Sequence, residues 1–309
     1  MRSIAVVTTS YPQRTGDPEG HFVRTEALAL AKAHRVSVFA PAASTRPRDN
    51  GVEVVEVSGG EAFGAPGLGS RLSERPDRVF GAVGFFFRLL RELESVPVDE
   101  LIVHWPFPTA LACRALTRRI PTTLVSHGAC VRALMRIPRP LRDGLVARLL
   151  DGPAVRWRFV SEPLRAELLS GVRENLAFCL AAQSYVEPPA IVLPARQDLG
   201  SPWPRSAFVV LGRLIASKYV DRIVDFFSTT SYAATHDLVL VGDGPHREAL
   251  MRRGRALGLR LHTPGTLPRN EALGLLAGAD GLLFASRAEG LSTVLREAAH
   301  YGVKVIHVP

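Results

Sequence analysis

The stretch GLLFASRAEGLSTVLREAAHYG, residues 281–302, predicts a buried strand, a turn and a helix in immediate succession. The run 281–285 is short and apolar, as expected of a strand inside a parallel sheet. Ser292 or Thr293 is suited to begin the helix as its N-cap, and Gly302 is suited to end it. A strand that passes directly into a helix is the repeating unit of a parallel sheet covered by helices.

The same alternation of short apolar runs and helical periods extends along the whole chain. Helical periods lie, for example, at 22–32, 110–119 and 271–277. The predicted strands are 3–9, 35–41, 52–57, 100–105 and 122–127 in the first half, and 207–212, 237–242, 259–265, 281–286 and 303–309 in the second. This pattern predicts an α/β protein with parallel sheets.

A length of 309 residues suits two domains of ordinary size. The chain turns irregular over 181–205, where five prolines interrupt every periodic pattern. We therefore predict an N-terminal domain over 1–190, a proline-rich hinge over 191–205 and a C-terminal domain over 206–309. Two such domains are expected to face each other across a cleft, with ligands outside the carboxyl ends of the strands.

The net charge of +9 does not indicate a nucleic-acid-binding protein. Of the 38 basic residues 35 are Arg, and they are scattered through the helices without interleaved aromatic residues. The three cysteines, Cys113, Cys130 and Cys179, are far apart and have no metal-ligand or redox spacing. They are consistent with a reducing cytoplasm.

The N-terminal segment MRSIAVVTTSYP predicts a buried strand and not a signal peptide, since its apolar run is short and lacks a small-residue cleavage site. We therefore expect a cytoplasmic protein. The stretch 130–150 mixes Arg132, Arg136, Arg139, Arg142 and Arg148 with apolar residues, as an interfacial helix does. Peripheral association with the inner face of the membrane is thus one interpretation, and solvated arginines on a packed helix are the other.

Charged residues follow the first predicted strand of the second half. The chain leaves this strand at Gly212 and continues with Arg213 and Lys218 in the next loop. A forked guanidinium and a compact ammonium together suit two neighbouring phosphates. Lys218 is notable because only three basic residues of the chain are lysines. Two solvated charges in a loop are the alternative interpretation.

A glycine turn follows the next predicted strand at 242–244, and Pro245 is suited to begin the helix behind it. As a dinucleotide-binding fingerprint the turn is weak, since a third glycine is missing. A tight strand-to-helix turn explains it equally well. Gly242 nevertheless lets the backbone approach a ligand closely.

The segment 289–297 combines two carboxylates with a helix start. Gly290 lets the chain bend, and the backbone N–H groups of 291–293 form an anion site at the helix N-terminus. Glu289 lies before this site and Glu297 lies beyond it inside the helix. Because a carboxylate accepts hydrogen bonds in pairs, each could hold a sugar diol at one end of a bound diphosphate.

Taken together, these motifs resemble the retaining glycosyltransferases of family 4, which have the GT-B fold. In the second half the resemblance rests on GRLIASKYVD (212–221), LVLVGDGPHREAL (238–250) and PGTLPRNEALGLLAGADGLLFASRAEGLSTVLREAAHYG (264–302). In the first half it rests on SYPQRTGDPEGHFVRTEALALA (10–31), HWPFPTALA (104–112) and LVSHGACV (124–131). It therefore spans nearly the whole chain.

The resemblance implies two Rossmann-like domains that face each other across a cleft. The N-terminal one would be the acceptor side and the C-terminal one would bind the nucleotide sugar. Relatives continue through another strand and further helices beyond the position of Pro309, so the second domain is expected to be shortened, as in a truncated chain.

For the second half the resemblance implies a role for each charged residue. Arg213 and Lys218 would bind the donor's diphosphate, Glu289 hydroxyls of the transferred sugar and Glu297 the ribose. The backbone at Gly290, Leu291 and Ser292 would face the phosphates.

For the first half it implies that His127 reaches the donor sugar near its reacting carbon. Gly20 would let the first loop approach donor or acceptor. A structural role for His127, in which it satisfies backbone groups at the strand end, is the alternative. No Asp-x-Asp metal motif follows a strand, so we expect neither a metal nor another cofactor.

The implied reaction transfers a sugar from a nucleoside-diphosphate sugar, of UDP or GDP type, to an acceptor hydroxyl with retention of the anomeric configuration. Backbone at 264–267 would contact the base. The acceptor could be a glycan, a natural product or a lipid-linked sugar. A GT-B sugar-nucleotide epimerase, a phosphorylase and a non-catalytic nucleotide-sugar-binding protein are the alternatives.

Overall fold

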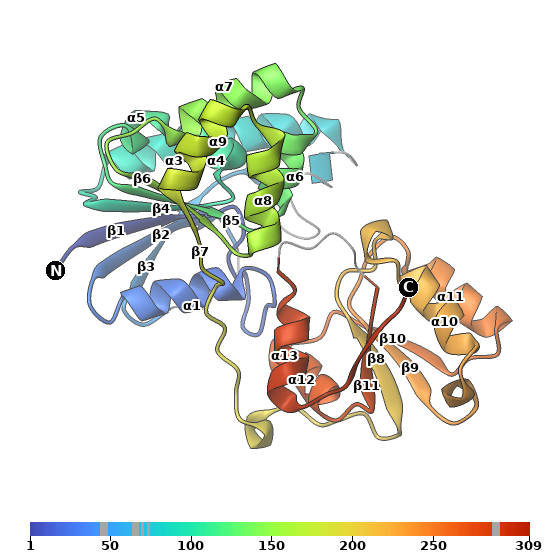
Figure 1. The fold of residues 1–309 in the computed structure, drawn as a ribbon. Coiled ribbons are helices and arrows are strands. Elements are labelled where there is room, and N and C mark those ends of the chain that lie inside the picture. The colour runs from blue at the N-terminus through green and yellow to red at the C-terminus, as the bar shows by residue number, and fades with distance from the viewer. Residues whose placement is uncertain (44–48, 64–67, 69–70, 73–74, 286–290) are drawn as a thin grey trace. The chain divides into compact units, whose positions relative to one another are not determined.

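The computed structural model describes residues 1–43, 49–63, 68, 71–72, 75–285 and 291–309. Its contacts divide the chain into two compact units, Met1–Ile191 and Val192–Pro309. Each unit is built on one parallel β-sheet flanked by helices (Figure 1). The predicted α/β class with two parallel-sheet domains is therefore confirmed, and the second domain is the smaller one.

The first unit has a sheet with the strand order β3-β2-β1-β4-β5-β6-β7. Its strands are β1 (Ser3–Val7), β2 (Arg35–Pro41), β3 (Val52–Val57), β4 (Glu100–His104), β5 (Thr122–Ser126), β6 (Val155–Phe159) and β7 (Ser184–Val186). Its helices are α1 (His21–Leu30), α3 (Val79–Glu94), α4 (Pro106–Ala112), α5 (Arg114–Thr117), α6 (Ala129–Met135), α7 (Arg139–Leu150), α8 (Glu162–Gly171) and α9 (Glu174–Gln183), with 3₁₀ helices at Gly60–Ala62 and Pro76–Arg78. Helix α1 covers one face of the sheet and the later helices cover the other (Figure 1).

The central strands are buried because helices cover both faces of the sheet. Val6, Val38 and Val103 are completely buried, and Val6 and Val38 share one hydrophobic core with Val23 and Ala27 of α1. A strand covered on both faces has a continuous apolar sequence instead of an alternating one. This is why central strands such as β1 and β4 could be predicted from short apolar runs.

Strands β6 and β7 were not predicted. In β6 the apolar residues Trp157 and Phe159 alternate with Arg156 and Arg158, so the continuous apolar run of a buried strand is missing. The two aromatic residues are fully buried, while the side chain of Arg158 is only 11% exposed. The sheet accommodates this arginine because it forms an ion pair with Glu26, which is described below.

The single helix predicted over 110–119 is wrong. Helix α4 ends at Ala112, and Cys113 leaves the helical conformation with φ −90° and ψ 13° before α5 begins. Cys113 is completely buried. The chain bends here so that this small side chain enters the core.

The second unit has a sheet with the strand order β10-β9-β8-β11-β12. Its strands are β8 (Ala207–Leu211), β9 (Asp237–Val241), β10 (Leu261–Gly265), β11 (Gly281–Phe284) and β12 (Val305–His307), and its helices are α10 (Val220–Ser228), α11 (Arg247–Ala256), α12 (Arg269–Ala277) and α13 (Thr293–Tyr301), with 3₁₀ helices at Arg196–Asp198, Ala216–Lys218 and Ser231–Ala234. Figure 1 shows α10 and α11 on one face of this sheet and α12 and α13 on the other. Each face has its own hydrophobic core.

The interpretation of 130–150 as an interfacial helix with exposed arginines is wrong for Arg142. The chain forms α6 and α7 here, and Arg142 of α7 is only 8% exposed. Its guanidinium donates to the carbonyl oxygens of Met135, at 3.1 Å, and Gly171. Arg142 thus pairs the carbonyl ends of α6 and α8, as a buried cation requires, and does not reach a membrane surface.

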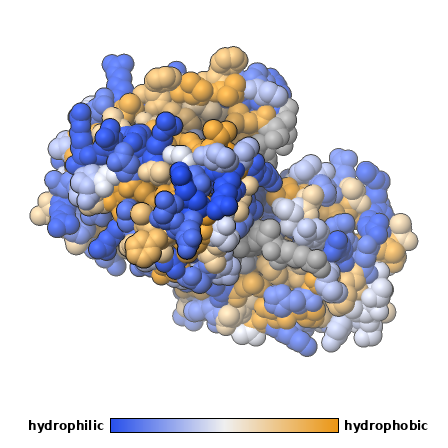
Figure 2. Space-filling model, turned by 45° about the horizontal axis from the view of Figure 1, so that its top comes forward, coloured by the Kyte–Doolittle hydropathy of each residue, from blue (hydrophilic) through white to orange (hydrophobic). Residues whose placement is uncertain are grey.

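Large hydrophobic side chains nevertheless reach the surface of the first unit, where they lie among hydrophilic residues (Figure 2). Phe80 and Phe87 of α3 are 79% and 74% exposed. Among the described residues, no helix combines the length and the apolar character needed to cross a membrane.

Candidate functional site

The predicted site residues of the second unit lie where strands end. Gly212, Arg213 and Lys218 follow β8, and Gly242 follows β9. Two backbone hydrogen bonds join the two loops, Leu214 N–H to Asp243 O at 2.9 Å and His246 N–H to Leu214 O at 3.2 Å, and Gly212 N–H donates to the last residue of β9, Val241 O, at 3.0 Å. The loops after β8 and β9 therefore form one rigid surface at the carboxyl edge of the sheet.

Gly242 is a glycine because the two loops touch at this residue. Its φ is 138°, and a β-carbon there would lie 2.0 Å from the carbonyl oxygen of Gly212. A β-carbon on Gly212 itself, with φ 146°, would meet no heavy atom of the described chain within 4 Å. Gly242 thus serves packing between the loops, whereas Gly212 presents its bare backbone to open space.

Arg213 and Lys218 belong to one compact loop. The N–H of Ile215 donates to Arg213 O, and the N–H of Lys218 donates to Ile215 O, each at 3.0 Å. Arg213 is exposed, and Lys218 is half-buried at the end of its 3₁₀ helix, directly before α10. Two cations are therefore held on a short loop beside the bare backbone of Gly212.

The start of α13 lies at the same edge, because β11 runs parallel to β8 as its neighbour. Ser292 is the N-cap residue and Gly302, with φ 70°, ends the helix, so both predicted boundaries are confirmed. Within the described chain no side chain hydrogen-bonds to cap α13, which leaves its first backbone N–H groups for an anion. Leu291 is half-buried beside them, while Glu289 and Gly290 lie outside the described residues.

Glu297 is on α13, as predicted, but it is buried and paired. The residue is 4% exposed, and Arg269 donates from Nη1 to its Oε1 at 2.7 Å. Arg269 is the first residue of α12, so this ion pair joins the two helices on one face of the sheet. It fixes the direction of the Glu297 carboxylate.

In the first unit, Gly20 begins α1 with φ 64°. A β-carbon there would lie 2.4 Å from the carbonyl oxygen of Ser10 and 2.8 Å from the Cα of Tyr11. This glycine therefore packs the first loop on itself. Its predicted approach to donor or acceptor stays a prediction.

His127 follows β5 directly and belongs to a polar network that spans three strands. The sheet register pairs His104 of β4 with Val125 of β5, and Val125 with Arg158 of β6, so His104 and Arg158 flank β5 on one row. Glu26 of α1 lies over this row. Its carboxylate contacts Arg158 Nη2 at 2.6 Å and lies 3.8 Å from His104 Nε2.

Both histidines are neutral at physiological pH. Burial is the main cause that lowers the pKa of His104, to about 3, and the charge of Arg158 adds to it. Burial, followed by His104 and Arg158, also lowers the pKa of His127 well below its ordinary value. Burial acts to lower the pKa of Arg158 as well, but Glu26 outweighs it and that pKa is raised.

Two aromatic rings also pack against His127. The ring centroids of Phe22 and Trp105 each lie 4.7 Å from that of His127. Phe22 comes from α1, and Trp105 follows β4 with φ 52°. Phe22 and Trp105 also contact each other, with centroids 5.9 Å apart, so the imidazole and the two rings form one aromatic cluster.

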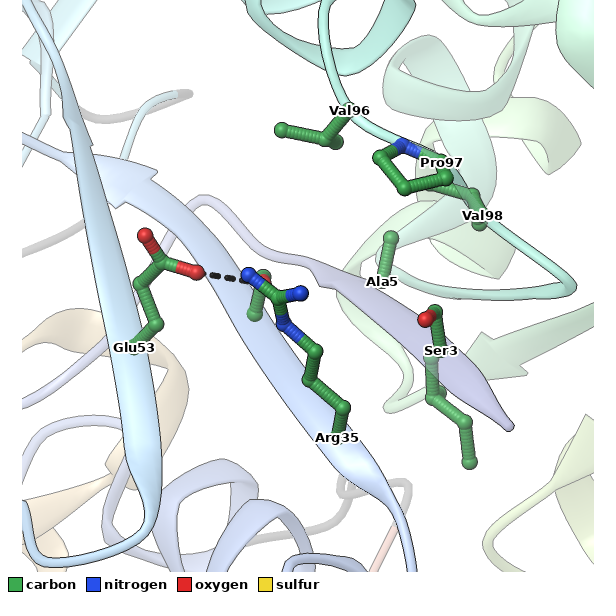
Figure 3. A pocket seen from close by; sticks show the side chains of 9 residues that line it. Ser3, Ala5, Arg35, Glu53, Val96, Pro97 and Val98 are labelled. Carbon is green, nitrogen blue, oxygen red and sulfur yellow. Dashed lines mark hydrogen bonds between the residues drawn. The ribbon is translucent and has the colours of Figure 1, made fainter. Parts of the chain in front are cut away.

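The hollow shown in Figure 3 lies at the opposite edge of the first sheet. It is lined by the first residues of β1, by Arg35 and Ser37 of β2, by Glu53 of β3 and by the turn 96–98. Its volume of about 30 Å³ is room for one or two water molecules. The hollow is too small for a nucleotide, and none of the predicted site residues lines it.

Sequence reasoning missed His104, Glu26, Arg158 and Arg269. For two of these residues, the sequence contains a feature that could have indicated a role. His104 ends a strand, as His127 nearly does, and Arg269 places a positive charge on the first turn of a helix, where the helix dipole disfavours it. Glu26 and Arg158 gain their meaning only when α1 and β6 come together.

Two family models match the chain. Residues 20–177 match the model described as Glycosyltransferase Family 4, and residues 194–309 match the one described as Glycosyl transferases group 1. Among curated proteins, a sequence search finds no match.

Solved structures similar to the chain include sucrose-phosphate synthase from Thermosynechococcus elongatus, with 15% identity, a TM-score of 0.70 and coverage of 99% of this chain and 81% of that chain. WaaG, a glycosyltransferase involved in lipopolysaccharide biosynthesis, has 17% identity, a TM-score of 0.61 and coverage of 98% and 80%. HepE from Anabaena, in complex with UDP and glucose, has 14% identity, a TM-score of 0.67 and coverage of 99% and 80%. At these identities the likeness shows the fold, which is GT-B.

Proposed function

The chain belongs to Glycosyltransferase Family 4, and we propose that it transfers a sugar from a nucleoside-diphosphate sugar to an acceptor hydroxyl with retention of the anomeric configuration. The observation that carries this proposal is the carboxyl edge of the second sheet. Three features lie at this edge within the described residues. They are the bare backbone of Gly212, the cations of Arg213 and Lys218, and the start of α13, which no described side chain caps.

In this proposal the edge of the second sheet binds the donor's diphosphate. The leaving diphosphate gains negative charge as the bond to the sugar breaks, and Arg213, Lys218 and the N–H groups near Ser292 stabilise that charge. A preorganised donor of this kind contributes about 3–4 kcal/mol to the transition state. Because Arg213 and Lys218 belong to a loop that backbone hydrogen bonds hold, little backbone reorganisation is needed there when the charge develops.

The remaining contacts orient the sugar and the nucleoside. Glu297, held by Arg269, accepts hydrogen bonds from the ribose diol through Oε2, which accepts none from the residues that the structure describes. Glu289 binds hydroxyls of the transferred sugar, and His127 contacts that sugar near its reacting carbon. The complex of HepE with UDP and glucose supports a donor of UDP type, with GDP as the second candidate.

We propose attack from the face that the diphosphate leaves, with the leaving phosphate deprotonating the acceptor hydroxyl. The bond from the anomeric carbon to the phosphate oxygen breaks, the acceptor oxygen bonds to the same face, and its proton passes to the phosphate. Side-chain cations neutralise the diphosphate, so the proposed reaction needs no metal.

The acceptor and the cellular location are part of the same proposal. The acceptor is a glycan, a natural product or a lipid-linked sugar, and the protein works in the cytoplasm, with peripheral association at the inner face of the membrane as the alternative. Salt-sensitive co-sedimentation with anionic lipid vesicles tests the membrane association, and its absence would contradict it.

A donor-turnover assay on the full chain tests the proposed function. UDP-sugars and GDP-sugars are supplied with water as the acceptor, release of the nucleoside diphosphate is followed, and the anomer of the released sugar is read by NMR before it mutarotates. We expect release with retention, unchanged by EDTA and about 100-fold slower in Lys218→Ala.

Lys304→Ala is the matched control, because Lys304 is another of the three lysines and is exposed beside β12. Release in Lys218→Ala at the rate of the unmodified chain would contradict the assigned site. An inverted anomer would contradict retention, and a second nucleotide sugar as product would favour an epimerase.

A further inference from the structure

His127 is joined to His104 by a hydrogen bond between their rings. His104 Nδ1 lies 2.9 Å from His127 Nε2, the ring planes differ by 13°, and the centroids are 5.1 Å apart. The centroid separation equals the N···N distance plus the two ring radii, so the rings lie edge to edge in nearly one plane. The shared hydrogen therefore lies on the line between the two nitrogens.

Only two proton arrangements are available to this pair. In a neutral imidazole one ring nitrogen donates and the other accepts. Either His127 donates from Nε2 to Nδ1 of His104, and both rings carry their proton on Nε2, or His104 donates from Nδ1, and both rings carry it on Nδ1. The two arrangements leave opposite hydrogen-bonding character on the outer nitrogen of His127.

Glu26 favours the first arrangement. His104 Nε2 is buried and has no hydrogen-bond partner among the described residues, and a Glu26 carboxylate oxygen lies 3.8 Å from it. An N–H dipole directed at a carboxylate is attracted, whereas a lone pair directed at it is repelled, and the difference is large where water is excluded.

The Glu26 carboxylate is itself held in place. Arg158 Nη2 lies 2.6 Å from both of its oxygens, and Nη1 of the same guanidinium lies 3.3 Å from Glu187. The side chains of Arg158 and Glu26 are only 11% and 15% exposed. The charge that faces His104 is therefore fixed in direction by β6 and does not swing into solvent.

We propose that Glu26 and His104 hold the proton of His127 on Nε2, so that Nδ1 of His127 presents a lone pair to the substrate. His127 Nδ1 has no hydrogen-bond partner among the described residues, and the ring is half-buried at the end of β5. Since the inference rests on the proposed function for the nature of the substrate, the group recognised is a hydroxyl of the donor sugar, which donates its hydrogen to Nδ1. Glu26 and His104 are positioning residues.

This polarity makes a prediction about donor specificity. A hydroxyl can donate to the Nδ1 lone pair, whereas fluorine at the same carbon can only accept and would face that lone pair. The position of the lone pair also predicts different activities for two substitutions of His127. The amide oxygen of His127→Asn can replace Nδ1 as an acceptor, but the longer side chain of His127→Gln places its amide near the position of Nε2.

NMR of the ring nitrogens in the nucleotide-free full chain tests the proton position. In ¹⁵N-labelled protein, chemical shifts distinguish protonated from unprotonated ring nitrogens, and coupling across the N–H···N bond identifies the pair. We expect a proton on Nε2 of His127 and none on its Nδ1. A proton on Nδ1 of either ring in the unmodified protein overturns the proposal.

Two matched variants test the part played by Glu26. Glu26→Gln removes the charge that faces His104, while Glu187→Gln removes the other carboxylate on Arg158 and leaves Glu26 in place. We expect the shared proton to move partly towards His104 in Glu26→Gln and to stay in place in Glu187→Gln. An unchanged spectrum in a folded Glu26→Gln variant shows that Glu26 does not set the polarity.

Failure of this inference and failure of the proposed function give different results. The ring spectra need no donor turnover, so they stand whether or not sugar is transferred. If the proton is on Nε2 but His127→Asn transfers sugar no faster than His127→Gln, the contact to a sugar hydroxyl is contradicted. If sugar is transferred while the proton is on Nδ1 of His127, the proposed function stands and the inference is contradicted.

Discussion

At the scale of single residues, two glycines on adjacent loops of the second unit have different roles: one allows the loops to pack closely and the other leaves its backbone open. Gly242 is required by the carbonyl oxygen of Gly212, whereas the β-carbon position of Gly212 is open in the described chain. A glycine in a ligand-binding motif thus need not face the ligand. The sequence predicts a close approach of the backbone to a ligand at Gly242, but the paired loops show that Gly212 is the open position in the described chain.

Gly242→Ala is expected to destabilise the second unit by about 2–4 kcal/mol, from backbone strain and from the clash with Gly212. Gly258→Ala is the matched control. Gly258 also has a positive φ, 68°, but a β-carbon on it would meet no described atom within 4 Å. It is expected to cost about 1–2 kcal/mol. Chemical denaturation measures both, and equal losses would show that the clash is relieved at no cost.

His104 links the stability of the first unit to pH. In the unfolded chain its pKa is near the ordinary 6.5, whereas burial, followed by Arg158, lowers it to about 3 in the folded protein. Below pH 6.5 the unfolded state therefore binds a proton that the folded state does not, and acidification favours unfolding. The expected loss is about 1.4 kcal/mol per pH unit across this window.

Urea denaturation at about pH 7 and about pH 5 measures this dependence. The stability of His104→Asn is expected to fall less steeply with acidification than that of the unmodified chain. His300→Asn is the control, since His300 is exposed on α13. The same slope in all three proteins would contradict a buried, neutral His104.

At the scale of elements, continuous apolar runs were sufficient to predict the central strands, but the arginine-containing run of β6 was not recognised. The buried strands β1, β4 and β9 were found because helices cover both of their faces. Strand β6 was missed because Arg156 and Arg158 interrupt its apolar run. A buried arginine is stable only beside its partner, and Glu26 lies more than a hundred residues away in sequence, so the sequence pattern alone does not indicate the pair.

The ion pair between α12 and α13 is expected to stabilise their packing. Arg269→Met leaves the Glu297 carboxylate buried without a counter-charge, which costs about 3–5 kcal/mol. The double variant Arg269→Met with Glu297→Leu is expected to recover most of this loss, because two apolar side chains replace a buried ion pair at little cost.

A double-mutant cycle by chemical denaturation measures this coupling. Losses that add without coupling would contradict the pair. Nucleotide binding should weaken in Arg269→Met and in Glu297→Leu. Glu297 is proposed to hold the ribose, and Arg269 sets the direction of its carboxylate.

At the scale of the whole molecule, the family and the fold could be predicted because ordered motifs extend along nearly the whole chain. The α/β class, the two domains and the positions of Arg213, Lys218 and Glu297 at or beyond strand ends follow from local sequence. The partners that tune these groups, such as Arg269 for Glu297 and His104 for His127, come from other elements, and tertiary packing alone brings them together.

The central claim is that the second unit binds a nucleoside diphosphate through Lys218 and Glu297. Calorimetric titration of the full chain with UDP, GDP, ADP and dTDP tests it most directly. We expect that one of these nucleotides binds, that Lys218→Ala and Glu297→Ala each weaken binding at least tenfold, or about 1.4 kcal/mol, and that Lys304→Ala does not. Binding of none of the four, or equal binding by Lys218→Ala and the unmodified chain, would contradict it.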